Sequence, residues 1–288
     1  MGQVRELQEH WLLALEAEGA ASATLQTYRV HSDIFLRQLG EGELNAFSVR
    51  AFLAEYGRGR ANESLRTVFS TLRSWLRFCV RDGLLPEGAL TGLRAPRRVE
   101  TRKQVYSAGQ LQALFRLLEG DRSALGLRNY ALCSVLLDGG LRVSETCALV
   151  LDSFRDGALV VGPGKSRRMR SVPLGQRSQR AVQRFLASGR PRLKPRSEHL
   201  FVGRDGYAIN RNTVRLMLTR LSERLGFRLS AHRFRHTWTT VMLRRGADLE
   251  TLRRLGGWAD YSMLLTYSHL TDNDLRAAQA RFSPLDGL

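Results

Sequence analysis

The stretch GALVVGPGKSRRMRSVPL, residues 157–174, decides the fold class of this chain. Its first half is apolar, Pro163–Gly164 favours a turn, and MRSVPL at 169–174 returns with the composition of a strand. The stretch therefore predicts a β-hairpin. Because the segments on both sides of it have the apolar spacing of helices, we expect a mainly α, α+β protein with one small antiparallel sheet.

Residues 1–92 are predicted to form a helical N-terminal domain. The first expected helix ends at Gly19, and a short helix is expected near 47–56. Two other helices are preceded by side chains that can accept hydrogen bonds from a helix start, so we expect Ser22 and Asn62 to act as N-caps. The helix after Asn62 has apolar residues on one side and arginines largely around the other.

A basic segment, LRAPRRVETRKQ at 93–104, is expected to link this domain to a second one over residues 105–288. Pro96 interrupts any helix there. The cations of this segment are Arg94, Arg97, Arg98, Arg102 and Lys103. A basic tether between two modules suits a protein that closes around a duplex as a clamp.

The charge balance of the chain points to a polyanionic partner. Among 288 residues, 45 are Lys or Arg and 27 are Asp or Glu, which gives a net charge of +18. Nucleic acid is the commonest polyanion for such a chain, and a merely basic, solvated surface is the alternative. The only lysines are Lys103, Lys165 and Lys194. A single arginine is therefore weak evidence for a functional site, whereas a lysine at a motif position that requires lysine is strong evidence for one.

The sequence gives no sign of secretion or of membrane insertion. Cys79, Cys133 and Cys147 have no paired spacing, as expected for a reducing compartment. The N-terminus lacks the apolar region of a signal peptide, and no apolar run approaches the roughly 20 residues that span a bilayer. We therefore expect a cytoplasmic protein that does not contact a membrane.

The motif GLRVSE at 140–145 places an arginine at the start of a helix. Gly139 and Gly140 are expected to end the preceding helix, which leaves Arg142 where backbone N–H groups favour an anion. Glu145 can hydrogen-bond the helix start or orient the Arg142 guanidinium. By itself, Arg142 is better explained as an ordinary surface arginine, one of 42 arginines in the chain.

Two other motifs resemble a nucleotide-binding site and a zinc site, but each lacks a residue that such a site requires. GPGKS at 162–166 lacks the first glycine of a P-loop and is followed by a strand, so ATP binding is rejected and Lys165 is placed at a hairpin tip. HRFRH at 232–236 has the histidine spacing of a zinc site but no glutamate. Arg235 adds a cation that opposes a metal ion. His236 is expected to pack within its helix or to support the site from behind.

Tyr267 follows Trp258 by nine residues in GGWADYSMLLTYSHL at 256–270. A phenol can act as a nucleophile, and an indole supplies one N–H donor. By itself, Tyr267 is better explained as a core aromatic residue than as a nucleophile.

Together these motifs resemble the tyrosine recombinase (phage integrase) family over nearly the whole chain. The resemblance implies a site-specific DNA recombinase that forms a 3′-phosphotyrosyl intermediate on Tyr267, without ATP, metal or any other cofactor. Lys165 would protonate the leaving 5′ oxygen, and His232 would exchange a proton with the tyrosine hydroxyl. The implied catalytic residues are Arg142, Lys165, His232, Arg235, Trp258 and Tyr267. Many members, including the Xer type, have histidine where this chain has Trp258.

The resemblance also implies that residues 1–92 are a core-binding domain, which grips DNA opposite a catalytic domain at 105–288. The expected partner is double-stranded DNA with specific recombination sites. Two sites would be held by a homotetramer, or by a heterotetramer with a paralogue, at the nucleoid of a bacterial cell. The side chains expected to contact DNA are Arg66, Arg73, Arg77, Arg94, Arg97, Arg98, Arg102, Lys103, Arg167, Arg168 and Arg170.

Two other functions stay open. A type IB topoisomerase-like activity would use similar chemistry on one duplex, and a test for strand exchange between two sites separates the two. An architectural DNA-binding protein with a relic site is the other alternative. Against it, all of the implied catalytic positions hold competent residues, including Lys165.

Overall fold

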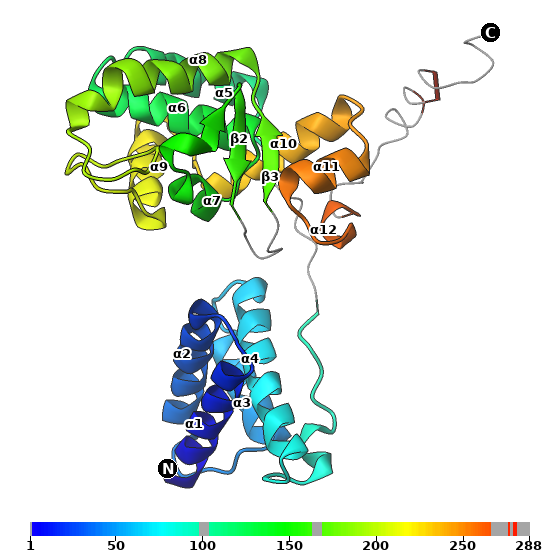
Figure 1. The fold of residues 1–288 in the computed structure, drawn as a ribbon. Helices are drawn as coiled ribbons and strands as arrows, with labels where there is room; N and C mark the ends of the chain where they lie inside the picture. Colours follow the sequence, from blue (N-terminus) through cyan, green and yellow to red (C-terminus); the bar gives the residue numbers. More distant parts are fainter. Residues whose placement is uncertain (1, 98–103, 163–168, 266–275, 277–278, 281–288) are drawn as a thin grey trace. The chain divides into compact units, whose positions relative to one another are not determined.

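The computed structural model describes residues 2–97, 104–162, 169–265, 276 and 279–280 (Figure 1). The chain divides into two compact units, residues 1–101 and residues 102–288. Each unit has its own apolar core. Among the described residues, no helix combines the length and the apolar character needed to cross a membrane.

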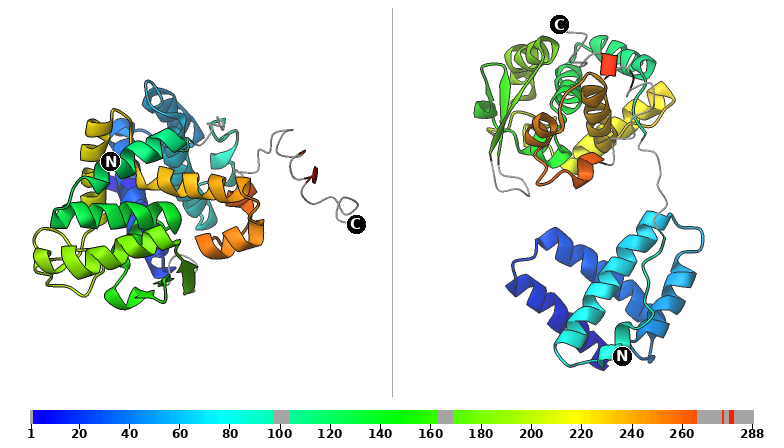
Figure 2. Two further views of the ribbon diagram at one scale, coloured as in Figure 1. Left: turned by 90° about the horizontal axis from the view of Figure 1, so that it is seen from above. Right: turned by 90° about the vertical axis from the view of Figure 1, so that its right-hand side faces the viewer.

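The N-terminal unit is built from helices, which Figure 2 shows from two further directions. Its elements are α1 (Gly2–Ala17), α2 (Ser22–Leu39), α3 (Ala46–Tyr56), α4 (Asn62–Arg81) and the 3-10 helix η1 (Glu87–Leu90). Trp11 of α1 and Trp75 of α4 stack at the centre with ring centroids 5.9 Å apart. Phe35 of α2 meets Trp75 edge-on, so three helices bury aromatic side chains in one core.

The predicted N-caps of two of these helices were wrong. Ser22 and Asn62 are the first helical residues, and the cap positions are Ala21 and Ala61, which form no side-chain cap. The side-chain cap lies instead at α3, where Asn45 accepts hydrogen bonds from the backbone N–H groups of Phe47 and Ser48, both at 3.0 Å.

The beginning of the expected linker packs on the N-terminal unit. Leu93 is buried in the core of that unit, and Arg66 donates a hydrogen bond to the carbonyl of Pro96. Arg94 and Arg97 are exposed. Arg98, Arg102 and Lys103 lie outside the described residues.

The C-terminal unit is mainly helical and contains one small sheet. Its helices are α5 (Ala108–Glu119), α6 (Ala124–Asp138), α7 (Val143–Ala148), α8 (Gln176–Arg184), α9 (Arg211–Leu225), α10 (Ala231–Arg244), α11 (Leu249–Gly256) and α12 (Ser262–Leu265). Short helical turns lie at η2 (Leu151–Ser153), η3 (Phe185–Gly189) and η4 (Pro191–Leu193). Helix α6 packs against α5, α8 and α10, and its Leu132 and Leu136 are fully buried in the core. The predicted fold class is confirmed.

The sheet has the antiparallel order β1 (Phe154–Arg155), β2 (Ala158–Val161) and β3 (Arg170–Pro173). The predicted hairpin is present as β2 and β3, in a register that pairs Leu159 with Val172. Strand β1 was not predicted. It joins β2 through Asp156 (φ 49°) and Gly157 (φ 74°), the positive-φ pair of a tight hairpin turn.

Candidate active site

Arg142 lies at the N-cap position of α7, as predicted. The chain reaches it through Gly140, whose φ is 57° and whose missing Cβ would lie 2.2 Å from the Trp238 ring. Glu145 performs both of the expected tasks. Its carboxylate accepts the Arg142 backbone N–H at 2.9 Å and the Arg142 guanidinium at 2.8 Å.

The Glu145 carboxylate is buried and shared between two arginines. Its side chain is 6% exposed, and Arg170 donates to both of its oxygens at 3.2 and 2.8 Å. Burial by itself would raise the pKa of Glu145, but the hydrogen bonds from Arg170 and from the Arg142 backbone outweigh it. The pKa of this carboxyl therefore lies below its ordinary value, and Glu145 is ionised between two cations.

Arg170 does not have the position expected of a DNA-contacting residue. Its side chain is only 11% exposed, and besides Glu145 it binds the carbonyl of Leu255 at 2.8 Å. Nε and both terminal nitrogens of Arg170 therefore all have partners within the protein. The DNA contact of Arg170 stays a prediction. Its protein partners were not predicted, because strand alternation does not reveal which residue a strand side chain meets.

Arg235 is a buried arginine whose two terminal nitrogens both bind backbone carbonyls. It lies on α10, is 5% exposed, and donates to the carbonyls of Gly140 and Gly256, both at 2.7 Å. Its guanidinium carbon lies 4.1 Å from the centroid of the Trp258 ring. Hydrogen bonds and aromatic stacking together fix the plane of this cation.

Three arginines meet at the C-terminal end of α11. Arg170 binds the carbonyl of Leu255, Arg235 that of Gly256, and Arg142 that of Gly257, the last at 3.2 Å. The last carbonyls of a helix lack partners within the helix and carry partial negative charge. These arginines therefore neutralise the end of α11 and tie it to α7, α10 and β3, the strand beside it in Figure 1.

The Gly-Gly-Trp sequence after this helix follows from close packing. A Cβ on Gly256 would lie 1.9 Å from the Trp258 ring, and one on Gly257 would lie 2.7 Å from the Arg170 guanidinium. Gly257 also has a φ of 65°, which favours glycine. Trp258 is 7% exposed and stacks on Trp238 at 6.2 Å. The indole N–H of Trp258 has no acceptor among the described residues.

The two histidines of α10 occupy different environments. His232 is exposed, whereas His236 is buried one turn further on. Their rings meet edge-on with centroids 3.9 Å apart. The expectation that His236 packs within its helix agrees with this geometry, and His232 is the one that a ligand could reach.

Lys165 and Tyr267 lie outside the described residues, as do Arg167 and Arg168. Helix α12 ends at Leu265, two residues before Tyr267. Another tyrosine nearby in sequence is already engaged, since the Tyr261 hydroxyl donates to Glu250 at 2.7 Å. Tyr106 is buried and its hydroxyl accepts the backbone N–H of Ser230 at 2.9 Å.

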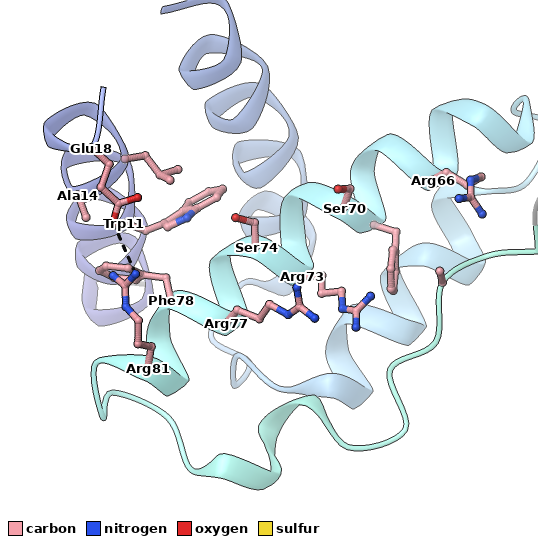
Figure 3. A pocket seen from close by; sticks show the side chains of 13 residues that line it. Trp11, Ala14, Glu18, Arg66, Ser70, Arg73, Ser74, Arg77, Phe78 and Arg81 are labelled. Carbon is pink, nitrogen blue, oxygen red and sulfur yellow. Dashed lines mark ion pairs between the residues drawn. The ribbon is translucent and has the colours of Figure 1, made fainter. Parts of the chain in front are cut away.

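The N-terminal unit has a separate basic groove of about 490 Å³ between α1 and α4. Figure 3 shows Arg66, Ser70, Arg73, Ser74, Arg77 and Arg81 along one side of α4, beside Trp11, Ala14 and Glu18 of α1. Arg81 pairs with Glu18 at 3.5 Å, and Arg73 lies 5.9 Å from the Phe69 ring. Arg66, Arg73 and Arg77 thus follow one edge of the helix without a carboxylate partner among the described ion pairs.

Known proteins share this sequence pattern. Residues 104–274 match the Phage integrase family. Tyrosine recombinase XerC of Anoxybacillus flavithermus is 32% identical, over 79% of this chain and 78% of its own length. Tyrosine recombinase XerC of Staphylococcus saprophyticus is 29% identical over 98% of both chains. Tyrosine recombinase XerD of Lacticaseibacillus casei is 28% identical over 92% of this chain and 94% of its own.

Solved structures share the fold. The Tn1549 transposon integrase in complex with circular intermediate DNA has a TM-score of 0.76 and 18% identity, over 95% of this chain and 98% of its own. The XerA recombinase has a TM-score of 0.56 and 23% identity, over 97% of this chain and 99% of its own.

Proposed function

This chain belongs to the phage integrase family and is a tyrosine-type site-specific recombinase, and on that premise we propose that Tyr267 is its nucleophile. One observation carries the proposal. The guanidinium groups of Arg142 and Arg235 are both anchored to the end of α11, and the chain continues from there through Trp258 toward Tyr267. Two fixed cations, joined to a segment that continues in sequence to a phenol, suit attack on a phosphodiester.

The reaction has two transfers at phosphorus. The Tyr267 oxygen attacks the scissile phosphate, a 3′-phosphotyrosyl bond forms, and the bond from phosphorus to the 5′ oxygen breaks. Lys165 gives a proton to the departing 5′ oxygen. The 5′-hydroxyl of a partner strand then attacks the phosphotyrosine, which reseals the DNA and releases the tyrosine. Because each step exchanges one phosphate ester for another, neither ATP nor a metal ion is needed to conserve the bond energy.

The described residues would stabilise the charge that builds up on the phosphate oxygens. Arg142 is 34% exposed, so the guanidinium N–H groups that bind neither Glu145 nor Gly257 can donate to a nonbridging oxygen. Arg235 supplies a second, more buried cation. His232 exchanges a proton with the tyrosine hydroxyl, and Trp258 supplies an indole donor and an apolar wall. Removal of one such donor costs roughly 10²–10³-fold in rate at comparable sites.

DNA is the proposed partner of both units. The arginines along α4 and the exposed Arg94 and Arg97 would contact backbone phosphates, which contribute affinity without reading sequence. Two recombination sites would be brought together by four copies of this chain, or by this chain with a paralogue. Because its relatives include recombinases of bacteria, the protein would meet such a substrate at the nucleoid of a bacterial cell.

A nicked suicide substrate tests the proposal. When the short strand beyond the cleaved bond diffuses away, the covalent intermediate cannot religate and accumulates. Wild-type protein is expected to form a covalent adduct, and Tyr267→Phe is expected to form none while it still binds the site. Tyr261→Phe is the matched control and is expected to form the adduct. An adduct on Tyr267→Phe would overturn the assignment.

Two-site and one-site activities are separated with the same protein. A recombinase exchanges strands between two sites, so a labelled duplex and an unlabelled one give a product of new length. Relaxation of supercoiled DNA without any exchanged product would instead favour the topoisomerase-like reaction.

A further inference from the structure

We propose, on the basis of the proposed function, that Arg170 is a positioning residue for strand cleavage. It fixes Arg142 and the end of α11 relative to each other and does not touch DNA itself. This role is different from the phosphate contact that its position in a basic strand suggests.

The contacts of Arg170 engage all three nitrogens of its guanidinium group. Its Nε donates to the Leu255 carbonyl at 2.8 Å, and its two terminal nitrogens donate to the two oxygens of Glu145 at 3.2 and 2.8 Å. A fork of this kind cannot be reproduced by lysine, whose charge is a single point. With 11% of its side chain exposed, Arg170 is more deeply buried than Arg142, of which 34% is exposed.

Glu145 transmits the effect of Arg170 to Arg142. The carboxylate is shared, because it accepts from the Arg142 guanidinium at 2.8 Å as well as from Arg170. Without Arg170, a buried carboxylate would have Arg142 as its remaining cationic partner. Arg142 would then be drawn closer to Glu145, so fewer of its N–H groups could donate to a phosphate oxygen.

Arg170 also sets the position of α11. It binds Leu255, while Arg235 and Arg142 bind the next two carbonyls. The Arg170 guanidinium fills the space where a Cβ of Gly257 would lie, at 2.7 Å. The segment that leads to Trp258 therefore packs directly on the Arg170 side chain. Removal of this side chain should let the segment shift relative to Arg142 and Arg235.

Single-turnover cleavage of the nicked site separates positioning from DNA contact. At saturating protein, Arg170→Gln is expected to cleave about a hundredfold more slowly than wild type, because small misplacements of catalytic groups have effects of that order. Its dissociation constant for the site, and the slope of log affinity against log salt, are expected to stay as in wild type. Arg170→Lys keeps the charge but loses the fork, so its cleavage is expected to be nearly as slow.

The pH profile gives a readout that a purely architectural role would not change. Among the described residues, Arg142 from the start of α7 and Arg170 from β3 are the charged groups that contact Glu145. In Arg170→Gln the pKa of Glu145 is expected to rise, because the hydrogen bonds from Arg170 no longer offset the effect of burial. On acidification, the cleavage rate of this variant is therefore expected to fall in a pH range where the wild-type rate does not change. The double variant Glu145→Gln with Arg170→Gln is expected to lose this added pH dependence.

The control is Arg177→Gln, which removes an exposed arginine paired with Glu119 and is expected to leave cleavage unchanged. Cleavage by Arg170→Gln at the wild-type rate would overturn the inference. So would an unchanged saturating rate with weaker binding and a salt slope reduced by about 0.9, which is the mark of a lost phosphate contact. If Arg170→Gln does not fold, Arg170→Lys decides between the same outcomes. Absence of a wild-type adduct would overturn the proposed nucleophile instead.

Discussion

Replacement of Arg235 by lysine should weaken the catalytic unit as well as the reaction. The wild-type guanidinium joins the carbonyl of Gly140, between α6 and α7, to that of Gly256 at the end of α11. Both glycines are buried, so water cannot replace the arginine as a hydrogen-bond donor to either carbonyl. A lysine ammonium is a single point and can hold one of the two carbonyls at hydrogen-bond distance.

The expected loss follows from the contacts that disappear. One hydrogen bond from a charged donor is worth about 1.5–3 kcal/mol, and a buried acceptor left without a partner accounts for most of that figure. The stacking of the guanidinium on Trp258, at 4.1 Å, adds about 0.5–1 kcal/mol or more where water is excluded. We therefore expect Arg235→Lys to lower the free energy of unfolding by about 2–4 kcal/mol.

Urea unfolding monitored by tryptophan fluorescence and circular dichroism measures this loss. Arg142→Lys is the matched control, because Arg142 is 34% exposed and its bond to Gly257 is longer, 3.2 Å. Its loss of stability is expected to be less than half as large. Equal losses for the two variants, or a change within about 0.5 kcal/mol for Arg235→Lys, would refute the idea that Arg235 ties α11 to the core.

Three further variants test other parts of the structure. Because the pKa of Glu145 is lowered in the folded state, its ionised form adds stability that is complete above about pH 4.5 and is lost as the pH falls through the folded pKa. The free energy of unfolding should therefore fall less steeply with decreasing pH in Glu145→Gln than in wild type, and equal slopes would contradict this. Gly256→Ala should cost about 1–3 kcal/mol and change tryptophan emission, because its methyl group would meet Trp258; an unchanged melting temperature would contradict the packing. Replacement of Arg73 and Arg77 by glutamine should lower the slope of log affinity against log salt by about 1.8, measured by fluorescence anisotropy, and an unchanged slope would remove α4 from the DNA contact.

The elements that sequence predicts best here are those set by local chemistry. The β2–β3 hairpin follows from an apolar run, a turn pair and a return strand. The placement of Arg142 follows from two glycines and a helix start, and the dual role of Glu145 follows from its spacing of three residues. Each of these depends on neighbours within one turn or one strand.

What could not be predicted depends on contacts between distant residues. Arg170 meets Glu145 and Leu255 only because the sheet folds against α11, and alternation along a strand cannot name those partners. The two glycines before Trp258 are needed because of an indole and a guanidinium that pack on them. Strand β1 was missed since two residues carry no periodicity, although the Asp156–Gly157 pair that follows it is a recognisable turn signal.

The N-caps of α2 and α4 were predicted wrongly for a different reason. Ser22 and Asn62 have suitable side chains, yet each helix begins one residue earlier than a cap at that position would allow. The preceding alanines adopt the extended backbone of an N-cap without contributing a side chain. Packing of the helix against its neighbours, rather than the cap, decides where such a helix starts.

The proposed mechanism requires that Tyr267 becomes covalently joined to DNA. The most direct measurement is mass spectrometry of peptides from wild-type protein trapped on a nicked suicide site, after digestion of both protein and DNA. We predict a nucleotide mass on the peptide that contains Tyr267, attached through a 3′ phosphate. A nucleotide on Tyr261 or on any serine, or a 5′ linkage, would contradict the account.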